Sequence, residues 1–160
     1  MALNDRAVQE LKEKFAPAVL EVKEFRGETT VTIRKESVVE VCRHLKGLGY
    51  NLLTDVTAVD YMGRDPRFMV VYNLYSIPAK ERLRIKAPVT EADCTIASMT
   101  ILWNAANWLE REVWDLMGIG FTGHPDLRRI LMTDDWVGHP LRKDYPLQGP
   151  DREPYKGRLS

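Results

Sequence analysis

The sequence predicts an α+β fold: a mainly antiparallel sheet of about five strands with helices on one face, followed by an extended C-terminal arm. Five short apolar or alternating segments are typical of strands, and helical patterns stand between groups of them. The composition changes near residue 118. Six of the ten glycines and five of the nine prolines lie at or beyond Gly118, and few aliphatic residues follow Thr133. That last segment cannot form a core of its own, which favours an arm lying on another protein.

The N-terminal segment, up to Arg34, predicts a helix and a hairpin. Asn4 can cap a helix that runs to about Phe15, and Pro17 stops it. The segments 19–25 and 29–34 are separated by a short turn containing glycine. In the second segment apolar and polar residues alternate, as expected for a half-buried β-hairpin.

A second helix and three strands are predicted next. Ser37 and Glu40 have the spacing of a capping box, and Gly47 is a plausible C-terminal cap of the helix that they begin. Cys42 falls on the apolar stripe of this helix, which indicates packing in the core rather than a reactive thiol. Three further strands are predicted at residues 52–61, 67–76 and 81–87.

Length and charge limit the possible functions. A chain of 160 residues fits one domain, which we place at 1–132, with the arm at 133–160. Lys plus Arg and Asp plus Glu both number 23, so the formal net charge is zero and nucleic-acid binding is not expected. No apolar run approaches the ~20 residues that span a bilayer, so no membrane span is expected either.

Two cysteines and no signal-peptide pattern indicate reduced thiols in a cytoplasmic protein. The chain has no C-x-x-C motif, so it is not expected to ligate iron–sulfur clusters or structural zinc of the usual thiolate types. Gly118 to Gly123 match the glycine pattern of dinucleotide-binding loops. However, a helix precedes this segment where a strand is needed, so a loop after a helix is the better interpretation.

The densest polar cluster lies on a helix predicted at about 104–117. Its buried stripe is predicted to contain Ala105, Leu109, Val113 and Leu116. The polar residues are Glu110, Arg111, Glu112 and Asp115, and Arg128 and Arg129 follow the next turn. Paired carboxylates can serve acid–base catalysis, but neighbouring arginines favour their ionised form. A structural ion-pair network is therefore the better prediction.

Two histidines allow an alternative. His124 and His139 each lie between a glycine and a proline, and with Asp126 or Asp134 they could hold a metal ion in a small hydrolase. The simpler expectation is that both imidazoles donate hydrogen bonds to nearby carbonyl groups and stabilise tight turns.

The run Glu110–Leu131, EREVWDLMGIGFTGHPDLRRIL, resembles the signature of the 30-kilodalton subunit (the C subunit) of respiratory complex I, the proton-translocating NADH:quinone oxidoreductase. The run Met132–Leu147, MTDDWVGHPLRKDYPL, is similar to the closing block of that family. DVTAVDY (55–61) and RFMVVYNLYS (67–76) resemble its strands. The resemblance covers most of the chain, with Met117 and Thr133 as departures from the usual pattern.

The resemblance implies a non-catalytic structural or assembly subunit whose arm packs on a neighbouring subunit of the 49-kilodalton type, near iron–sulfur subunits. It implies that this chain binds no cofactor, with FMN and iron–sulfur clusters in partner subunits. It also implies a peripheral position on the cytoplasmic side of the bacterial inner membrane. The open alternatives are an equivalent subunit of a related membrane-bound hydrogenase or other-donor dehydrogenase, the hydrolase, and an adaptor with a free tail.

Two sets of residues carry these expectations. Residues matching the signature are expected to lock the junction between helix and loop: Glu110, Arg111, Glu112, Asp115, Gly118, Gly123, His124, Pro125, Asp126, Arg128 and Arg129. Residues of the arm are expected to contact the partner: Trp136, Pro140, Leu141, Arg142, Lys143, Asp144, Tyr145 and Pro146. Aromatic and arginine side chains among the latter are the usual hot spots of an interface.

Overall fold

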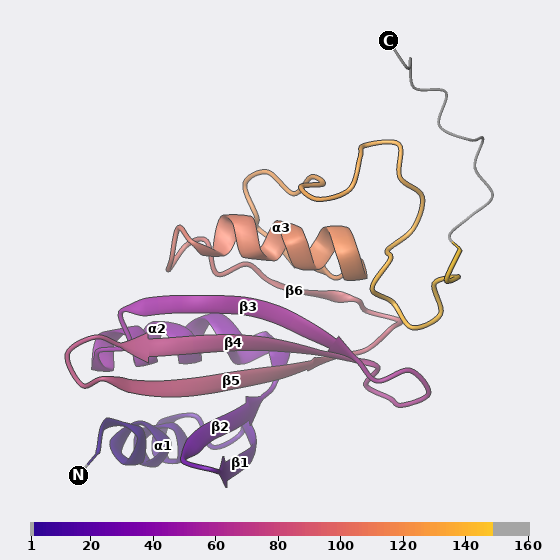
Figure 1. Ribbon diagram of the computed structural model, residues 1–160. Coiled ribbons are helices and arrows are strands. Elements are labelled where there is room, and N and C mark those ends of the chain that lie inside the picture. Colours follow the sequence, from indigo (N-terminus) through magenta and orange to yellow (C-terminus); the bar gives the residue numbers. More distant parts are fainter. Residues whose placement is uncertain (1, 149–160) are drawn as a thin grey trace.

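A five-stranded sheet forms the centre of the protein, as seen in a computed structural model that describes residues 2–148 (Figure 1). Residues 149–160 of the predicted arm lie outside the described residues. The sheet contains, in spatial order, β1 (Val19–Phe25), β2 (Glu28–Ile33), β5 (Glu81–Val89), β4 (Phe68–Ser76) and β3 (Leu52–Asp60). The predicted α+β class and the number of main strands are confirmed.

Strand pairing is mostly between sequence neighbours. β1 and β2 form the predicted hairpin, whose turn places Arg26 and Gly27 at φ 52° and 79°. Two consecutive positive φ angles suit a tight hairpin because they match the twist of the flanking strands. β3, β4 and β5 form an antiparallel meander. The two groups join through a parallel pairing of β2 with β5.

The helices α1 (Leu3–Lys14), α2 (Val38–Leu48) and α3 (Ala106–Met117) cover one face of the sheet. Along β4 the side chains Phe68, Val70, Tyr72 and Leu74 are buried, whereas the residues between them are on average more exposed. Burial raises the pKa of the Tyr72 hydroxyl, and the charges of Glu110 on α3 and Cys42 on α2 raise it further. Both helices therefore lie on the face of the sheet from which Tyr72 projects. The predicted layer arrangement is confirmed.

Both predicted side-chain caps of the first two helices are wrong. The Asn4 side chain accepts a hydrogen bond from the Tyr50 hydroxyl at 2.6 Å and does not cap α1. Instead, the backbone N–H groups of Leu3 and Asn4 donate to the Glu81 carboxylate at 3.0 and 2.7 Å. A carboxylate at this position is also stabilised by the positive, N-terminal end of the helix dipole. The cap comes from β5, so a local pattern could not reveal it.

The second helix begins with a 3₁₀ turn, η1 (Lys35–Ser37), so Ser37 makes no side-chain cap. It ends at Gly49, with φ 118°, and not at Gly47. The left-handed conformation at Gly49 explains why glycine ends the helix there. Cys42 is fully buried on the stripe, as predicted, and burial raises the pKa of its thiol to about 12.

A small parallel pair of strands, β6 (Thr95–Ala97) and β7 (Gly120–Thr122), was not predicted. The glycine-rich segment after α3 is therefore partly a strand, which corrects the expectation of a loop. Gly118 ends α3 with φ 73°, and a Cβ there would lie 2.5 Å from the His139 ring. Glycine is needed at this position both for its backbone angle and for this close approach.

No helix within residues 2–148 is long and apolar enough to cross a membrane.

Candidate functional site

Asp115 is the centre of the polar network at the end of α3. Its side chain is fully buried, and its Oδ2 accepts hydrogen bonds from the backbone N–H groups of Ile130, Leu131 and Met132 at 3.0, 2.8 and 2.9 Å. Its Oδ1 pairs with Arg129 at 2.5 Å. Burial alone would raise the pKa of this carboxyl, but the four hydrogen bonds outweigh it and lower the pKa.

Arg129 connects Asp115 to the arm. Besides the ion pair, its guanidinium donates to the backbone carbonyl oxygens of Trp136 and Gly138 at 2.8 and 3.1 Å. It also lies over the Trp114 ring, 5.8 Å from the centroid. Arg129 thus links the helix, the loop after β7 and the arm.

The sequence predicted three arginines beside the carboxylates of α3. Two of them, Arg111 and Arg128, make other contacts. Arg111 donates to the carbonyl oxygens of Arg128 and Arg129, at 3.1 Å each, and lies over the Trp108 ring. The Arg128 side chain pairs with Asp126 at 2.9 Å, and both are exposed. Arg111 therefore holds the loop by its backbone, and Arg128 belongs to a surface ion pair.

The buried stripe of α3 is not the one predicted. Val113 is buried, but Leu109 and Leu116 are only half-buried, and Ala105 is exposed. Glu110 takes a place in the core instead and is fully buried. The buried stripe is therefore rotated about the helix axis relative to the predicted one, so that it includes Glu110.

Glu110 finds its partners in the segment after β6. Its carboxylate accepts hydrogen bonds from the Ser98 hydroxyl and the Met99 backbone N–H, both at 2.6 Å. Burial raises its pKa to about 7, and these hydrogen bonds offset only part of the increase. Glu112, by contrast, is exposed. The two glutamates of the signature therefore have different environments, one in the core and one on the surface.

The two histidines lie at opposite ends of α3. Within the loop between Gly123 and Pro125, His124 contacts the Asn107 carbonyl through Nε2 at 3.0 Å and accepts from the Asp126 N–H through Nδ1. His139 Nδ1 lies 2.9 Å from the Asp115 carbonyl. The two carbonyls are eight residues apart, about 12 Å along a helix. The hydrolase alternative therefore lacks its ligand set, and residues 2–148 contain no cluster of three or more His, Cys, Asp or Glu able to hold a metal.

The arm lies across the C-terminal end of α3. The last carbonyls of a helix have no partner within it and need one elsewhere. Here the Asp115 carbonyl contacts His139, the Leu116 carbonyl accepts from the Leu141 N–H at 2.9 Å, and the Met117 carbonyl accepts from Arg142 at 2.7 Å. Three residues of the arm thus complete the end of the helix.

A second ion-pair cluster holds the arm against the sheet. Arg67, almost fully buried, makes two hydrogen bonds to Asp60 at 2.9 and 3.0 Å. The same guanidinium contacts Glu91 at 2.6 Å and Asp144 of the arm at 2.8 and 3.0 Å. The Lys143 N–H donates to Asp60 at 2.9 Å. We call Asp60, Arg67, Glu91 and Asp144 the Arg67 cluster.

Sequence reasoning missed the Arg67 cluster because its members are far apart in the chain. Arg67 and Asp144 are separated by 77 positions. One signal was available: Asp60 and Arg67 are charged residues at the ends of two apolar strands, where burial requires a partner. Arg67 and Arg142 also lie over Phe68, at 5.0 and 5.1 Å from its centroid, so the cluster closes around a core aromatic ring.

The remaining arm residues are placed as follows. Tyr145 donates to the Val137 carbonyl at 3.1 Å, and its ring packs against Gly138. Trp136 and Pro140 are partly buried, whereas Leu141, Lys143 and Pro146 are exposed. Several residues that were expected to contact a partner therefore make contacts within this chain instead. Arg142 and Asp144 are the clearest cases.

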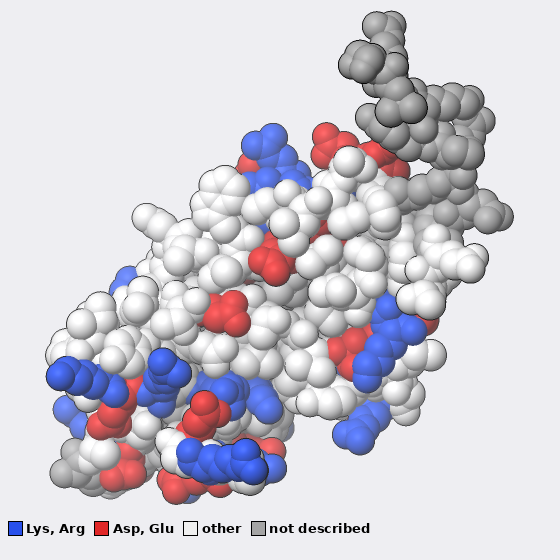
Figure 2. All heavy atoms as spheres, viewed as in Figure 1, with Lys and Arg blue, Asp and Glu red and all other residues white. Residues whose placement is uncertain are grey.

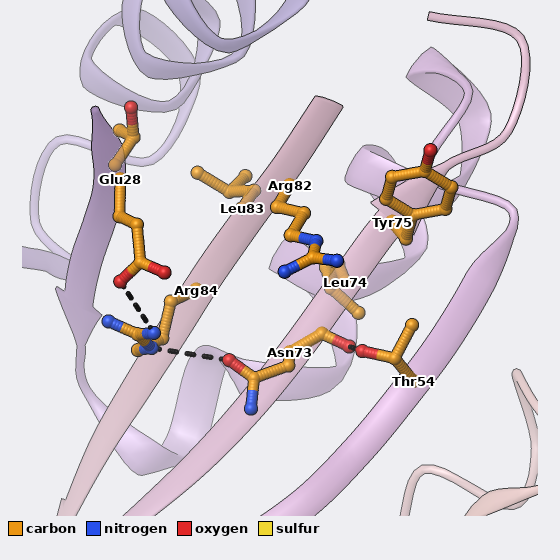
Figure 3. A pocket seen from close by; sticks show the side chains of 9 residues that line it. Glu28, Thr54, Asn73, Leu74, Tyr75, Arg82, Leu83 and Arg84 are labelled. Carbon is orange, nitrogen blue, oxygen red and sulfur yellow. Dashed lines mark hydrogen bonds and ion pairs between the residues drawn. The ribbon is translucent and has the colours of Figure 1, made fainter. Parts of the chain in front are cut away.

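A separate cavity of about 600 Å³ lies over the sheet (Figure 3). Its polar side chains bond to one another: Arg84 pairs with Glu28 at 2.8 Å and donates to Asn73 at 3.2 Å, while Thr54 donates to the Asn73 carbonyl at 2.8 Å. None of the predicted site residues lines this cavity. The α3–arm junction is therefore the better candidate for the functional site.

The fold and this junction define a class: a small α+β domain whose C-terminal segment is tied to its last helix. Residues 31–151 match the family described as the respiratory-chain NADH dehydrogenase, 30 Kd subunit. The chain is 74% identical over 161 residues to the C subunit of the NADH-quinone oxidoreductase of Geotalea uraniireducens, covering 100% of this chain and 98% of that protein. It is 73% identical to the same subunit from Geobacter sulfurreducens, covering 100% of both. The chain therefore belongs to the family of the respiratory-chain NADH dehydrogenase 30 Kd subunit.

Solved structures agree. The trypsin-resistant fragment (1–134) of Nqo5 matches with a TM-score of 0.71 and 36% identity, covering 78% of this chain and 99% of the fragment. A chain of the archaeal membrane-bound sulfane sulfur reductase shares the fold, with a TM-score of 0.76 at 24% identity, covering 89% of this chain and 85% of that one. The predicted resemblance to the family is confirmed.

We expect Asp115→Asn to lower the free energy of unfolding by about 3–5 kcal/mol, because it leaves the Arg129 charge buried without its partner. The NH2 group of the amide would also face either the backbone N–H groups or the Arg129 guanidinium, and both need an acceptor. Urea unfolding of the full chain measures this. Glu112→Gln, on the exposed side of the same helix, should change the value by less than about 0.5 kcal/mol. Equal effects of the two variants would contradict the role of Asp115.

The raised pKa of Glu110 predicts stability that decreases with pH. Its ordinary value is 4.5 and its folded value about 7, so the folded state keeps a proton that the unfolded state has lost. The contribution is complete below about pH 4.5 and is lost as pH rises to 7. Its size is on the order of 3 kcal/mol, at ~1.4 kcal/mol per pKa unit. In Glu110→Gln this decrease should be absent from unfolding curves recorded between pH 4.5 and 7.5. An unchanged slope in the variant would rule out Glu110 as its source.

Asp144→Asn should loosen the arm, because the Arg67 cluster then loses the charged group that holds it. Trypsin cleaves after arginine and lysine, so cleavage after Arg142 and Lys143 in the native protein should become faster, by about tenfold. Digestion followed by mass spectrometry measures the rate. Asp126→Asn, in the exposed pair with Arg128, is the control and should leave the rate unchanged. Equal rates in the two variants would show that the cluster does not hold the arm.

Proposed function

We propose that this chain is a non-catalytic structural or assembly subunit in the peripheral arm of a proton-translocating NADH:quinone oxidoreductase. In this role it packs on the subunit of the 49-kilodalton type and supports electron transfer from NADH to quinone without taking part in the chemistry. The observation that supports the proposal most strongly is that the charged residues of the family signature bond to other groups of the same chain. Arg111, Asp115 and Arg129 all contact groups of this chain, where they determine its shape.

The relatives support the same assignment. They are named as subunits of NADH-quinone oxidoreductase, and two of them match this chain over its whole length. For Nqo5 the trypsin-resistant part is the fragment 1–134, and it aligns with most of this chain. We infer a comparable division here, with a compact domain and a C-terminal arm that engages the partner.

Cofactors are proposed to belong to partner subunits. Iron–sulfur clusters are usually held by four thiolates, and this sequence has two cysteines. Cys42 is buried in the core, and Cys94 lies 3.7 Å from the Gly118 carbonyl. The two thiols therefore have packing environments, and we assign FMN and the clusters to neighbouring subunits.

The proposed location is the cytoplasmic side of the bacterial inner membrane, as a peripheral part of the complex. The bacterial sources of the relatives support it. An equivalent subunit of a membrane-bound hydrogenase or other-donor dehydrogenase is the second candidate. The fold shared with the sulfane sulfur reductase complex keeps it open.

Affinity purification of the tagged full chain from detergent-solubilised membranes of its own source tests the proposal. We expect co-purification of a subunit of the 49-kilodalton type, with flavin and iron–sulfur absorbance and NADH oxidation. Nickel-containing hydrogenase partners would support the second candidate. Recovery of the chain alone and colourless would contradict both.

A further inference from the structure

A chain of hydrogen-bonded hydroxyl groups leads from the buried Glu110 carboxyl group toward the protein surface. Glu110 Oε2 lies 2.6 Å from the Ser98 hydroxyl, and the Ser98 hydroxyl lies 2.7 Å from the Thr100 hydroxyl. Exposure increases along this chain: Glu110 is fully buried, Ser98 is 3% exposed and Thr100 is half-buried. The three groups therefore form a continuous path out of the core.

The outer end of this path opens into a cavity at the N-terminal end of α3. The cavity has a volume of about 510 Å³, and Thr100 lines it together with Asn104, Asn107 and Trp108. The described residues that line it are uncharged. In the view of Figure 2, charged side chains gather mainly at the end of the molecule that holds α1, and uncharged atoms dominate the middle. Water in a cavity with several polar groups is therefore the group that exchanges a proton with Thr100.

The hydrogen bonds of Ser98 fit both protonation states of Glu110. A serine hydroxyl has one donor and two acceptor sites. When Glu110 is ionised, Ser98 donates to it and accepts from the Thr100 hydroxyl and from the Thr100 backbone N–H, the latter at 3.1 Å. When Glu110 is protonated, its O–H donates to Ser98, and Ser98 donates to the Thr100 hydroxyl. Both arrangements use all three sites of Ser98, so rotation of the hydroxyl groups is enough to convert one into the other.

The path also defines how a proton leaves. Glu110 Oε1 accepts from the Met99 backbone N–H at 2.6 Å, so Oε2 is the oxygen that carries the proton. The O–H bond at Oε2 breaks as Ser98 takes that proton, Ser98 passes its own proton to Thr100, and Thr100 passes its own to water. One carboxylate and one hydronium ion form, and both hydroxyl groups keep one proton each. The reverse sequence protonates the carboxylate.

The path ends at Glu110 on its inner side. The Tyr72 hydroxyl of β4 is close enough for the Glu110 charge to raise its pKa, and Cys42 of α2 acts on the same hydroxyl. Among the described residues, however, the Tyr72 hydroxyl has no hydrogen-bond partner. The chain of hydrogen bonds therefore connects Glu110 with the solvent and does not lead through the core.

Other charged or titratable groups around Glu110 and the cavity are bonded elsewhere. They are Arg111 on α3, bonded to the loop after β7; Lys46 on α2, bonded to the Leu102 carbonyl; Asp60 on β3, paired with Arg67; and His124, whose ring nitrogens contact the Asn107 carbonyl and the Asp126 N–H. The two hydroxyl groups thus offer the continuous route for the proton.

We propose that Glu110, Ser98 and Thr100 form a proton relay, through which the buried carboxyl group exchanges its proton with solvent while the domain stays folded. Burial raises the pKa of Glu110 to about 7, so both of its protonation states occur at neutral pH. The charge at this position in the core then follows the pH of the surrounding solvent. The inference does not depend on the proposed function.

Infrared spectroscopy of the full-length protein after a light-triggered pH jump tests the relay. The carboxylic acid carbonyl band that is missing in Glu110→Gln reports the protonation of Glu110. Thr100→Val keeps the shape of the side chain and the backbone N–H but removes the outer hydroxyl group. We expect its protonation and deprotonation rates both to fall by about tenfold or more, because the proton must then wait for local opening of the fold.

Three further variants serve as comparisons. Thr100→Ser keeps a hydroxyl group at the same place and should keep the wild-type rates. Thr54→Val is the matched control: it removes a hydroxyl group that bonds to the Asn73 carbonyl beside the separate cavity over the sheet, and it should change neither rate. Ser98→Ala removes the middle of the relay and should slow both rates. It also removes a hydrogen bond that lowers the pKa of Glu110, so the ratio of its rates should shift toward the protonated form.

The two rates separate a relay from a structural role. Hydroxyl groups that only stabilise the fold or the carboxylate would change the melting temperature or the ratio of the rates, which is the pKa, and would not slow both steps together. Wild-type rates in Thr100→Val would overturn the inference. If Ser98→Ala fails to fold, Thr100→Val decides, since its site is half-buried. The absence of a titrating Glu110 band from the wild-type protein would also overturn the inference.

Discussion

The second half of the structure depends on one buried carboxylate. An ionised group removed from water is tolerated only where hydrogen bonds and an opposite charge replace the solvent. Asp115 obtains three backbone donors and one guanidinium, so residues 129–132 must pass close to the end of α3. Arg129, held there by the pair, then reaches the carbonyls of Trp136 and Gly138. The course of the arm thus follows from the need to satisfy a single charge.

The end of α3 imposes a second requirement of the same kind. Its last carbonyls need donors, and the arm supplies them through His139, Leu141 and Arg142. A few residues later Asp144 joins Arg67, whose charge is nearly buried at the sheet end. Because helix, sheet and arm each contain a group that the others satisfy, the described part of the arm is attached to the domain at several points.

This use of charge bears on function. Motif residues that look like candidate catalysts in the sequence instead fold the junction, with Glu110 bonded to Ser98 and Asp115 to the loop. Residues that look like interface anchors, such as Arg142, bond within the chain. These contacts within the chain are the reason for proposing that it acts as a structural subunit of an assembly.

The sequence by itself determined the features that depend on local interactions: the β1–β2 hairpin, the extents of the three helices to within a few residues, and the burial of Cys42. It also contained the motif that identifies the family. Only the tertiary structure decided the parallel pairing of β2 with β5, the capping of α1 by Glu81, the burial of Glu110 and the Arg67 cluster. Periodicity and capping patterns report contacts within a few positions, whereas these contacts join groups far apart in the chain, such as Leu3 and Glu81, 78 positions apart, and Arg67 and Asp144, 77 positions apart. A buried charge requires a partner, but the residues around it in the sequence do not say which distant group the fold will bring to it.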